Sequence, residues 1–135
     1  MSKKIEMKKI DELTKATRGE CVHLYALIRD LKSNKLSEQA KKAYTLLRID
    51  LLNLQKEYET ARQEIAEQTK PDNETQADWD RAFIPIVEEW LKTESNINLK
   101  IFSVDDYIDF ISSNELSGSV EDAIYQLMVK NESVE

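Results

Sequence analysis

The chain has 135 residues, the size of one ordinary domain with room for a hydrophobic core. It contains only 2 glycines and 2 prolines, whereas charged residues make up 33% of it. This composition is typical of long solvated helices and excludes a sandwich or barrel, which needs many glycine-containing turns. We therefore predict a single, mainly α domain over residues 1–135.

The formal net charge is -7, and its distribution divides the chain in two. Residues 1–70 contain 15 Lys and Arg against 11 Asp and Glu, a net charge of +4. Residues 71–135 contain 4 Lys and Arg against 15 Asp and Glu, a net charge of -11. We predict two subregions, a basic helical hairpin over 1–70 and an acidic, aromatic-rich helical cap over 71–135.

Cysteine and histidine are too few for several kinds of site. Cys21 is the only cysteine, so an internal disulfide is excluded. Together with the single histidine, His23, it cannot supply the roughly four ligands of a Cys/His zinc site. No apolar run approaches the roughly 20 residues of a membrane-spanning helix, and residues 1–6 lack the apolar core of a signal peptide. We expect a cytoplasmic protein that contacts no membrane.

The spacing of apolar residues changes within the N-terminal third of the chain. Ile5 and Met7 alternate with charged residues, which predicts a short strand over 4–7. Apolar residues then recur every three or four positions, which predicts an amphipathic helix over 9–32. Gly19 lies inside that helix and lowers its stability by about 1 kcal/mol relative to alanine, so we expect a kink or a break in the segment Thr17-Arg18-Gly19.

The next segment has the most regular pattern in the chain. Ser37 is the predicted N-cap of a helix over 38–68, which would be roughly 46 Å long. Apolar residues follow a heptad repeat along it, and we call them the seam. The seam consists of Ala40, Tyr44, Leu47, Leu51, Leu54, Tyr58, Ala61 and Ile65. The two helices are predicted to form a long antiparallel hairpin, with Leu46, Ile49 and Leu52 adding apolar surface beside the seam.

A polar loop over 70–78 follows, because Pro71 cannot continue the helix. Helical spacing resumes with Trp79 and Trp90, but Pro85 interrupts it. Since proline fits the first helical turn and not the interior, we expect the regular helix to begin near Pro85.

The C-terminal part predicts a second short strand over 97–101, where apolar and polar residues alternate. Its partner would be the 4–7 strand, giving a two-stranded β-ribbon, or a second copy of the protein. Ser103 and Ser119 each precede a carboxylate by two or three positions, a capping pattern that predicts two short helices.

No catalytic residue, cofactor or metal is predicted. Cys21 and His23 are two positions apart on a helix and point to different faces, so we expect a buried thiol and a half-exposed imidazole. Carboxylates are frequent over 72–80 and 105–109, but the first segment lacks the glycine and final glutamate of an EF-hand loop. A metal-dependent enzyme that uses this acidic loop is kept as an alternative hypothesis.

The sequence favours a non-enzymatic protein-interaction or assembly module that self-associates through the long helix. The seam is longer than the first helix can cover if that helix breaks at Gly19. Trp79 and Trp90 are expected in the core and would mark a partner site if exposed. The candidate interaction residues are Tyr44, Leu47, Leu51, Leu54, Tyr58, Trp79 and Trp90.

A nucleic-acid-associated or DNA-mimicking regulator is the other alternative. Its basic half could contact phosphate, or its acidic half could occupy a phosphate-binding groove of a partner. The acidic total argues against general nucleic-acid binding, which needs clustered Lys and Arg. No feature of the sequence indicates a small-molecule substrate.

The order of the predicted segments also resembles that of a known group of proteins. A Lys-Ile-Glu-Met opening at 4–7 precedes a long helix with Tyr-Thr-Leu-Leu-Arg at 44–48, a Pro-Asp loop at 71–72 and a Glu-Glu-Trp-Leu helix at 88–91. This layout resembles small helical proteins of unassigned function from tailed phages and prophages, and it covers most of the chain. The resemblance implies a phage or mobile-element accessory protein and implies no catalytic residues.

Overall fold

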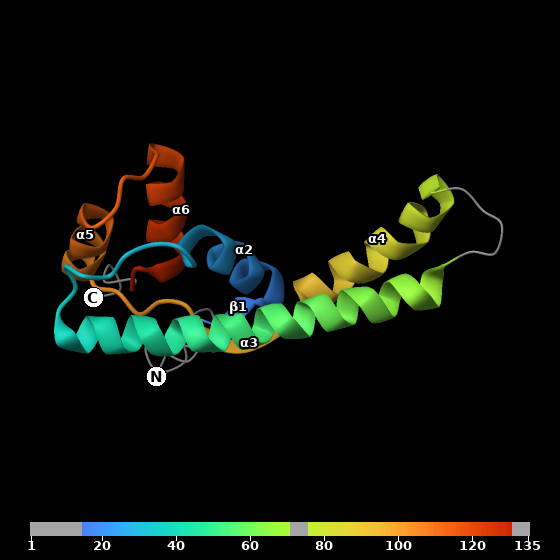
Figure 1. The fold of residues 1–135 in the computed structure, drawn as a ribbon, viewed down its shortest axis with the longest axis horizontal. Helices are drawn as coiled ribbons and strands as arrows, with labels where there is room; N and C mark the ends of the chain where they lie inside the picture. The colour runs from blue at the N-terminus through green and yellow to red at the C-terminus, as the bar shows by residue number, and fades with distance from the viewer. Residues whose placement is uncertain (1–14, 71–75, 131–135) are drawn as a thin grey trace, which may run out of the picture.

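The computed structural model describes residues 15–70 and 76–130, and Figure 1 shows its ribbon. These residues form five helices and one two-stranded antiparallel sheet. In chain order the elements are β1 (Lys15–Thr17), α2 (Arg18–Ile28), α3 (Glu38–Thr69), α4 (Gln76–Lys92), β2 (Glu94–Asn98), α5 (Val104–Ser112) and α6 (Gly118–Met128). The predicted mainly α fold, with a long helix and a β-ribbon, is confirmed.

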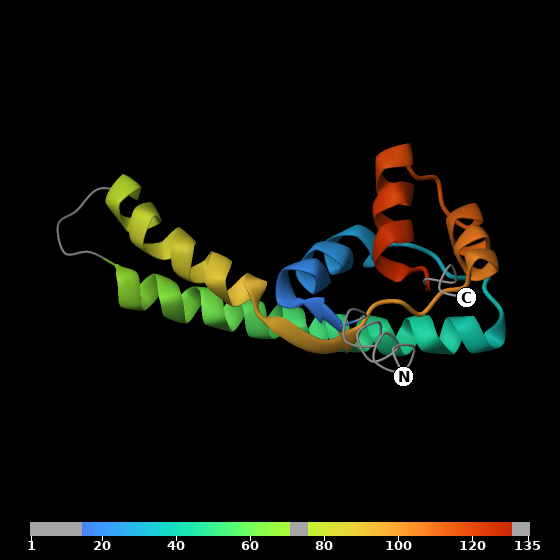
Figure 2. The same cartoon turned by 180° about the vertical axis from the view of Figure 1, so that it is seen from behind.

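Helix α3 is the axis of the molecule. Its 32 residues span about 48 Å, and the Ser37 hydroxyl caps it by accepting a hydrogen bond from the Ala40 amide at 3.2 Å, as predicted. Helices α2, α5 and α6 lie over its N-terminal half, and α4 runs back along its C-terminal half (Figures 1 and 2). Among the described residues, no helix is both long enough and apolar enough to cross a membrane.

Helix α2 begins later than the predicted 9–32 helix, whose residues 9–14 lie outside the described part. The Thr17 hydroxyl accepts from the Glu20 amide at 3.1 Å, while the Glu20 carboxylate accepts from the Thr17 amide at 3.0 Å. This capping box starts the helix at Arg18. The predicted helix is therefore broken within the expected segment 17–19, where β1 ends at Thr17 and Gly19 lies in the first turn of α2. A Cβ atom at Gly19 would lie 3.1 Å from the Leu91 carbonyl oxygen, so glycine allows this close approach of α4.

Helix α4 also differs from its predicted start near Pro85. It begins at Gln76 and keeps Pro85 in its interior, although proline donates no hydrogen bond to the preceding turn. The first turn of α4, on the N-terminal side of Pro85, is held against α3, since the Trp79 indole N–H donates to the Ala66 carbonyl at 3.2 Å. Tertiary contact with α3 therefore outweighs the local preference of proline.

The ribbon pairs β1 with β2, in the register Lys15 with Asn98 and Thr17 with Glu94, with one irregularity between these pairs. The predicted strand at 4–7 lies outside the described residues. The predicted strand over 97–101 is displaced towards the N-terminus, because backbone pairing with β1 recruits the polar residues that begin β2. The Ser95 hydroxyl strengthens this pairing by donating to the Ala16 carbonyl at 2.7 Å.

Two short helices complete the fold. Ser103 forms the predicted capping box, since its hydroxyl accepts from the Asp106 amide at 3.1 Å. The predicted cap at Ser119 is wrong, because the Ser117 hydroxyl accepts from Val120 and places Ser119 in the first turn of α6. The Phe102 amide donates to the Met128 carbonyl at 2.9 Å and closes the end of α6 onto the segment before α5.

The core centres on three aromatic rings. The centroid distances are 6.1 Å for Tyr44 and Phe102, 5.0 Å for Tyr44 and Phe110, and 5.3 Å for Phe102 and Phe110. Other side chains that are less than 2% exposed surround them and come from α2, α3, the β2–α5 segment and α6. They are Cys21, Leu24, Ile28, Leu51, Leu99, Ile124 and Met128.

Two side chains of α3 also bind the C-terminal end of α2. The Tyr44 hydroxyl donates to the Ile28 carbonyl at 3.1 Å, and the Arg48 guanidinium donates to the Arg29 carbonyl at 2.7 Å. Carbonyls at a helix C-terminus have no partner within the helix. The Ile28 carbonyl also accepts from the Leu31 amide at 2.9 Å, so the two side-chain bonds add to this closing turn and tie the end of α2 to α3. Burial raises the pKa of Tyr44 to about 12, although the nearby Arg48 charge lowers it.

Neighbouring leucines of α3 provide a test of this burial. We expect Leu51→Ala to lower the free energy of unfolding by about 2–5 kcal/mol, because Leu51 is 1% exposed and its removal leaves a cavity. Leu52→Ala is the matched control and should change it by less than about 0.5 kcal/mol, since Leu52 is 39% exposed. Urea unfolding followed by circular dichroism measures both. Equal losses would contradict the assigned orientation of α3.

The raised pKa of Tyr44 predicts a loss of stability in alkali. The unfolded chain releases this proton near pH 10 and the folded chain near pH 12, so the contribution is complete below about pH 10 and is lost as the pH rises to about 12. We expect wild type to exceed Tyr44→Phe by about 1 kcal/mol at neutral pH. By pH 12 wild type should lose as much as about 2 kcal/mol relative to Tyr44→Phe, which removes or reverses this difference. Parallel pH profiles of the two proteins would contradict the assignment.

Candidate interaction surfaces

Four of the seven predicted interaction residues lie in the core. Tyr44, Leu47, Leu51 and Leu54 are 1%, 4%, 1% and 6% exposed, and they belong to one cluster of buried residues with α2 and the C-terminal segments. Tyr58, one turn further along the seam, is half-buried. The N-terminal part of the seam is therefore covered by its own chain, and an accessible surface lies elsewhere on α3.

The opposite face of α3 is apolar and open. Leu46, Ile49 and Leu52 are 54%, 50% and 39% exposed, and we call them the outer stripe. At about 3.6 residues per turn, this row lies on the side of α3 away from Leu47 and Leu51. Lys41 and Lys42 precede it in the sequence, and Asp50, within the stripe, is the one acidic residue between positions 39 and 52.

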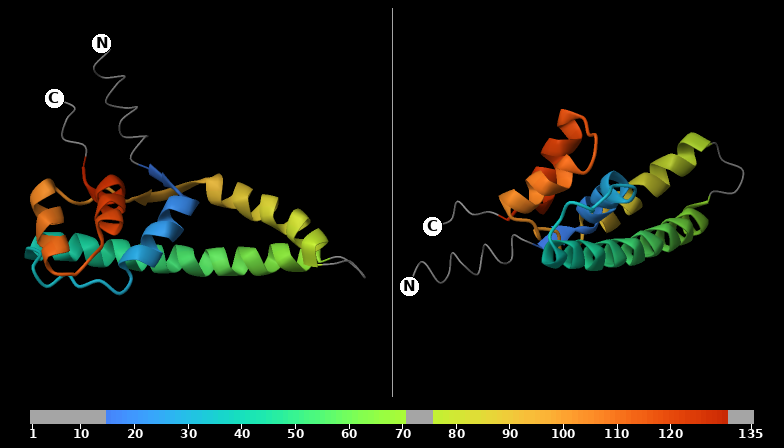
Figure 3. Two further views of the ribbon diagram at one scale, coloured as in Figure 1. Left: turned by 90° about the horizontal axis from the view of Figure 1, so that it is seen from above. Right: turned by 60° about the vertical axis from the view of Figure 1, so that its left-hand side comes forward.

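The C-terminal half of α3 (residues 55–69) and α4 form a helical hairpin that we call the arm. It extends past α2, away from α5 and α6 (Figure 3). The Trp90 ring joins the arm to the core, with its centroid 5.6 Å from that of Tyr58 and the Arg18 guanidinium 4.4 Å above it. Within the described residues of the arm, Val87 is the one buried residue, so the arm has little interior of its own.

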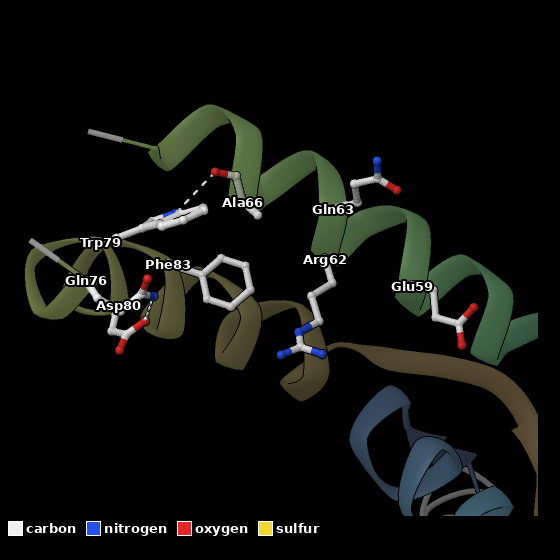
Figure 4. A pocket seen from close by; sticks show the side chains of 8 residues that line it. All are labelled: Glu59, Arg62, Gln63, Ala66, Gln76, Trp79, Asp80 and Phe83. Carbon is white, nitrogen blue, oxygen red and sulfur yellow. Dashed lines mark hydrogen bonds between the residues drawn. The ribbon is translucent and has the colours of Figure 1, made fainter. Parts of the chain in front are cut away.

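A groove of about 430 Å³ runs between the two helices of the arm (Figure 4). The Trp79 and Phe83 rings project from α4 towards α3 within it, and the Arg62 guanidinium lies 5.7 Å from the Phe83 ring centroid. The residues that line the groove are Glu59, Arg62, Gln63, Ala66, Gln76, Trp79, Asp80 and Phe83. Such a surface suits an apolar side chain, since it offers aromatic faces.

Helix α5 exposes a second apolar face. Val104 and Ile108 are 39% and 49% exposed and lie one turn apart, with exposed Asp105 and Asp109 following each of them. Residues 101–129 contain six acidic and no basic residues. Sequence reasoning missed this face, because the spacing of Val104 and Ile108 resembles that of a buried stripe until Phe110 is known to occupy the core.

Ion pairs do not join the two subregions in the described part of the chain. Three ion pairs occur there, and each links residues at most three positions apart. They are Arg29–Asp30, Arg81–Asp78 and Lys92–Glu89. The opposite charges of the basic and acidic subregions are therefore not neutralised against each other by direct contact within the described fold.

The possible reactive groups are held in structural roles or are dispersed. Cys21 is buried as expected, with its sulfur 3.4 Å from the Ser95 hydroxyl oxygen, and burial raises the pKa of its thiol. His23 is exposed rather than half-exposed. In the ranges that the structure describes, no three His, Cys, Asp or Glu side chains are grouped closely enough to hold a metal ion. Of the predicted acidic segments, residues 72–75 lie outside those ranges, and Asp106 is engaged in capping α5.

The two tryptophans, both half-buried, should differ in their contribution to stability. We expect Trp90→Ala to lower the free energy of unfolding by about 3 kcal/mol, because Trp90 packs between Tyr58 and Arg18 beside the core. Trp79→Ala should lower it by less than about 1 kcal/mol and instead speed amide exchange in 60–69, where the arm opens locally. Urea unfolding and hydrogen exchange measure the two effects. Similar global losses would contradict the separation of arm and core.

Comparison with known proteins gives no relative on which to base a function. The chain matches no protein-family model, no curated protein sequence and no solved structure. A functional proposal therefore depends on the surfaces described above.

Proposed function

We propose that the chain is a non-enzymatic protein-interaction or assembly module that self-associates through the outer stripe of α3. The observation that carries this proposal is the row Leu46, Ile49 and Leu52, three large aliphatic side chains each at least 39% exposed on successive turns. Single exposed leucines are common on protein surfaces, but an aligned row on one helix is typical of an interface.

The amphipathic pattern of α3 supports this assignment. A helix at the surface of a single globular domain usually has one apolar face, which packs on the core. In helix α3 the seam is the face that packs on the core, and the outer stripe is a second, exposed apolar row. The seam was the predicted contact, and the proposal moves that contact to the opposite face because the fold already covers Leu47, Leu51 and Leu54.

A second copy is the proposed partner because the chain carries both signs of charge in separate regions. The outer stripe follows Lys41 and Lys42, and residues 101–129 of any other copy provide six carboxylates without a basic residue. The phage or mobile-element origin implied by the sequence layout fits an assembly role. We propose this origin together with the assembly role.

Substitution of the central residue of the outer stripe tests the proposal. We expect wild type to form species larger than a monomer at tens of micromolar in sedimentation velocity or light scattering. Ile49→Glu should be monomeric at the same concentration, because it places a charge in the apolar contact, and its melting temperature should stay close to that of wild type.

Thr60→Glu is the matched control. Position 60 lies on the same face of α3, three turns beyond Ile49, and is also exposed, but it lies outside the outer stripe. It should associate as wild type does. A wild-type monomer at tens of micromolar, or equal association of Ile49→Glu and wild type, would refute self-association through this face.

A further inference from the structure

Two exposed apolar faces of the fold carry opposite charge. The outer stripe is preceded by Lys41 and Lys42, and within its own span of 46–52 the charged residues are Arg48 and Asp50, which gives this part of α3 a net positive charge. The face of α5 formed by Val104 and Ile108 is accompanied by Asp105 and Asp109. None of these lysines and aspartates forms an ion pair with a described residue. The positive charges beside the outer stripe therefore complement the negative charges beside the α5 face.

A single copy does not bring these faces together. Tyr44 of α3 and Phe110 of α5 meet in the core with their ring centroids 5.0 Å apart. The outer stripe lies on the side of α3 away from Tyr44, and Val104 and Ile108 lie on the side of α5 away from Phe110. The two faces thus point away from the core that both helices share, and they can meet only between copies.

The spacing of the side chains on the two faces is also compatible. Leu46, Ile49 and Leu52 form a row with a spacing of three residues, whereas Val104 and Ile108 form a row with a spacing of four. Rows of these two kinds interdigitate when helices cross at about 20°, which is the usual geometry of helix bundles. Helix α5, with 9 residues, is long enough to cover a stripe that spans six residue steps of α3.

We infer that the contact between copies is heterologous, with the outer stripe of one copy seated against the α5 face of the next. Lys41 and Lys42 of the first copy lie near Asp105 and Asp109 of the second. Each copy then has one face of each kind left for a neighbour, so the assembly grows as an open chain or closes as a ring of several copies. This contact rests on the self-association proposed above. Its test therefore has to distinguish a failure of the heterologous contact from a failure of self-association.

Reversal of the charge on each face provides that test. The stripe variant is Lys41→Glu with Lys42→Glu, and the α5 variant is Asp105→Lys with Asp109→Lys. We expect each variant alone to raise the apparent dissociation constant at least about tenfold, because like charges then meet. An equimolar mixture should restore association to within about threefold of wild type, because every contact again joins opposite charges. Sedimentation velocity measures all three samples.

Circular dichroism melting of each variant, and the neutral pair Asp105→Asn with Asp109→Asn, guard against a failure to fold. The neutral pair should weaken association less than the charge-reversed pair. Association of the α5 variant at wild-type strength would overturn the heterologous contact and leave self-association through the outer stripe intact, as two such stripes would then meet. A wild-type monomer would remove both. Wild-type binding of a DNA duplex at low salt that the stripe variant loses, without self-association, would assign the stripe to nucleic acid instead.

Discussion

The fold depends on the way α3 receives the end of α2. Tyr44 and Arg48 lie one turn apart on α3 and donate hydrogen bonds to the Ile28 and Arg29 carbonyls at the C-terminal end of α2. The same Tyr44 ring packs against Phe102 and Phe110, which come from the acidic subregion. One residue therefore fixes the crossing of the two helices and attaches the C-terminal part of the chain to them.

Strong local periodicity made part of this fold predictable. The α3 boundaries follow from the Ser37 cap and the unbroken seam, and the start of α5 follows from its capping box. The errors lie where tertiary contacts override local preference. Helix α4 passes through Pro85 because Trp79 is bonded to α3, and β2 begins at polar residues because β1 pairs with its backbone. The break expected at 17–19 does occur, and Gly19 there also permits the close approach of Leu91, which the sequence did not indicate.

The candidate surfaces were harder to predict than the elements that carry them. Periodicity identifies both apolar rows of α3 and favours the seam as the contact because the seam is longer, but it does not say which row the fold covers. The choice is decided by Phe102 and Phe110, which lie more than 50 positions away in sequence and pack on Tyr44. The α5 face depends in the same way on Phe110 turning inward. A single sequence does not show which side chains are buried by residues that lie far away along the chain.

The local character of the ion pairs separates the control of folding from the control of association. The three pairs in the described ranges are exposed and join near neighbours, a kind of contact that contributes at most about 1 kcal/mol to stability. The described core is held by aromatic packing and by hydrogen bonds to backbone carbonyls, which added salt screens little. A contact through Lys41 and Lys42 would instead be screened beyond about 10 Å at 0.1 M salt. In the proposed assembly, a higher ionic strength would therefore weaken the association between copies while each copy stays folded.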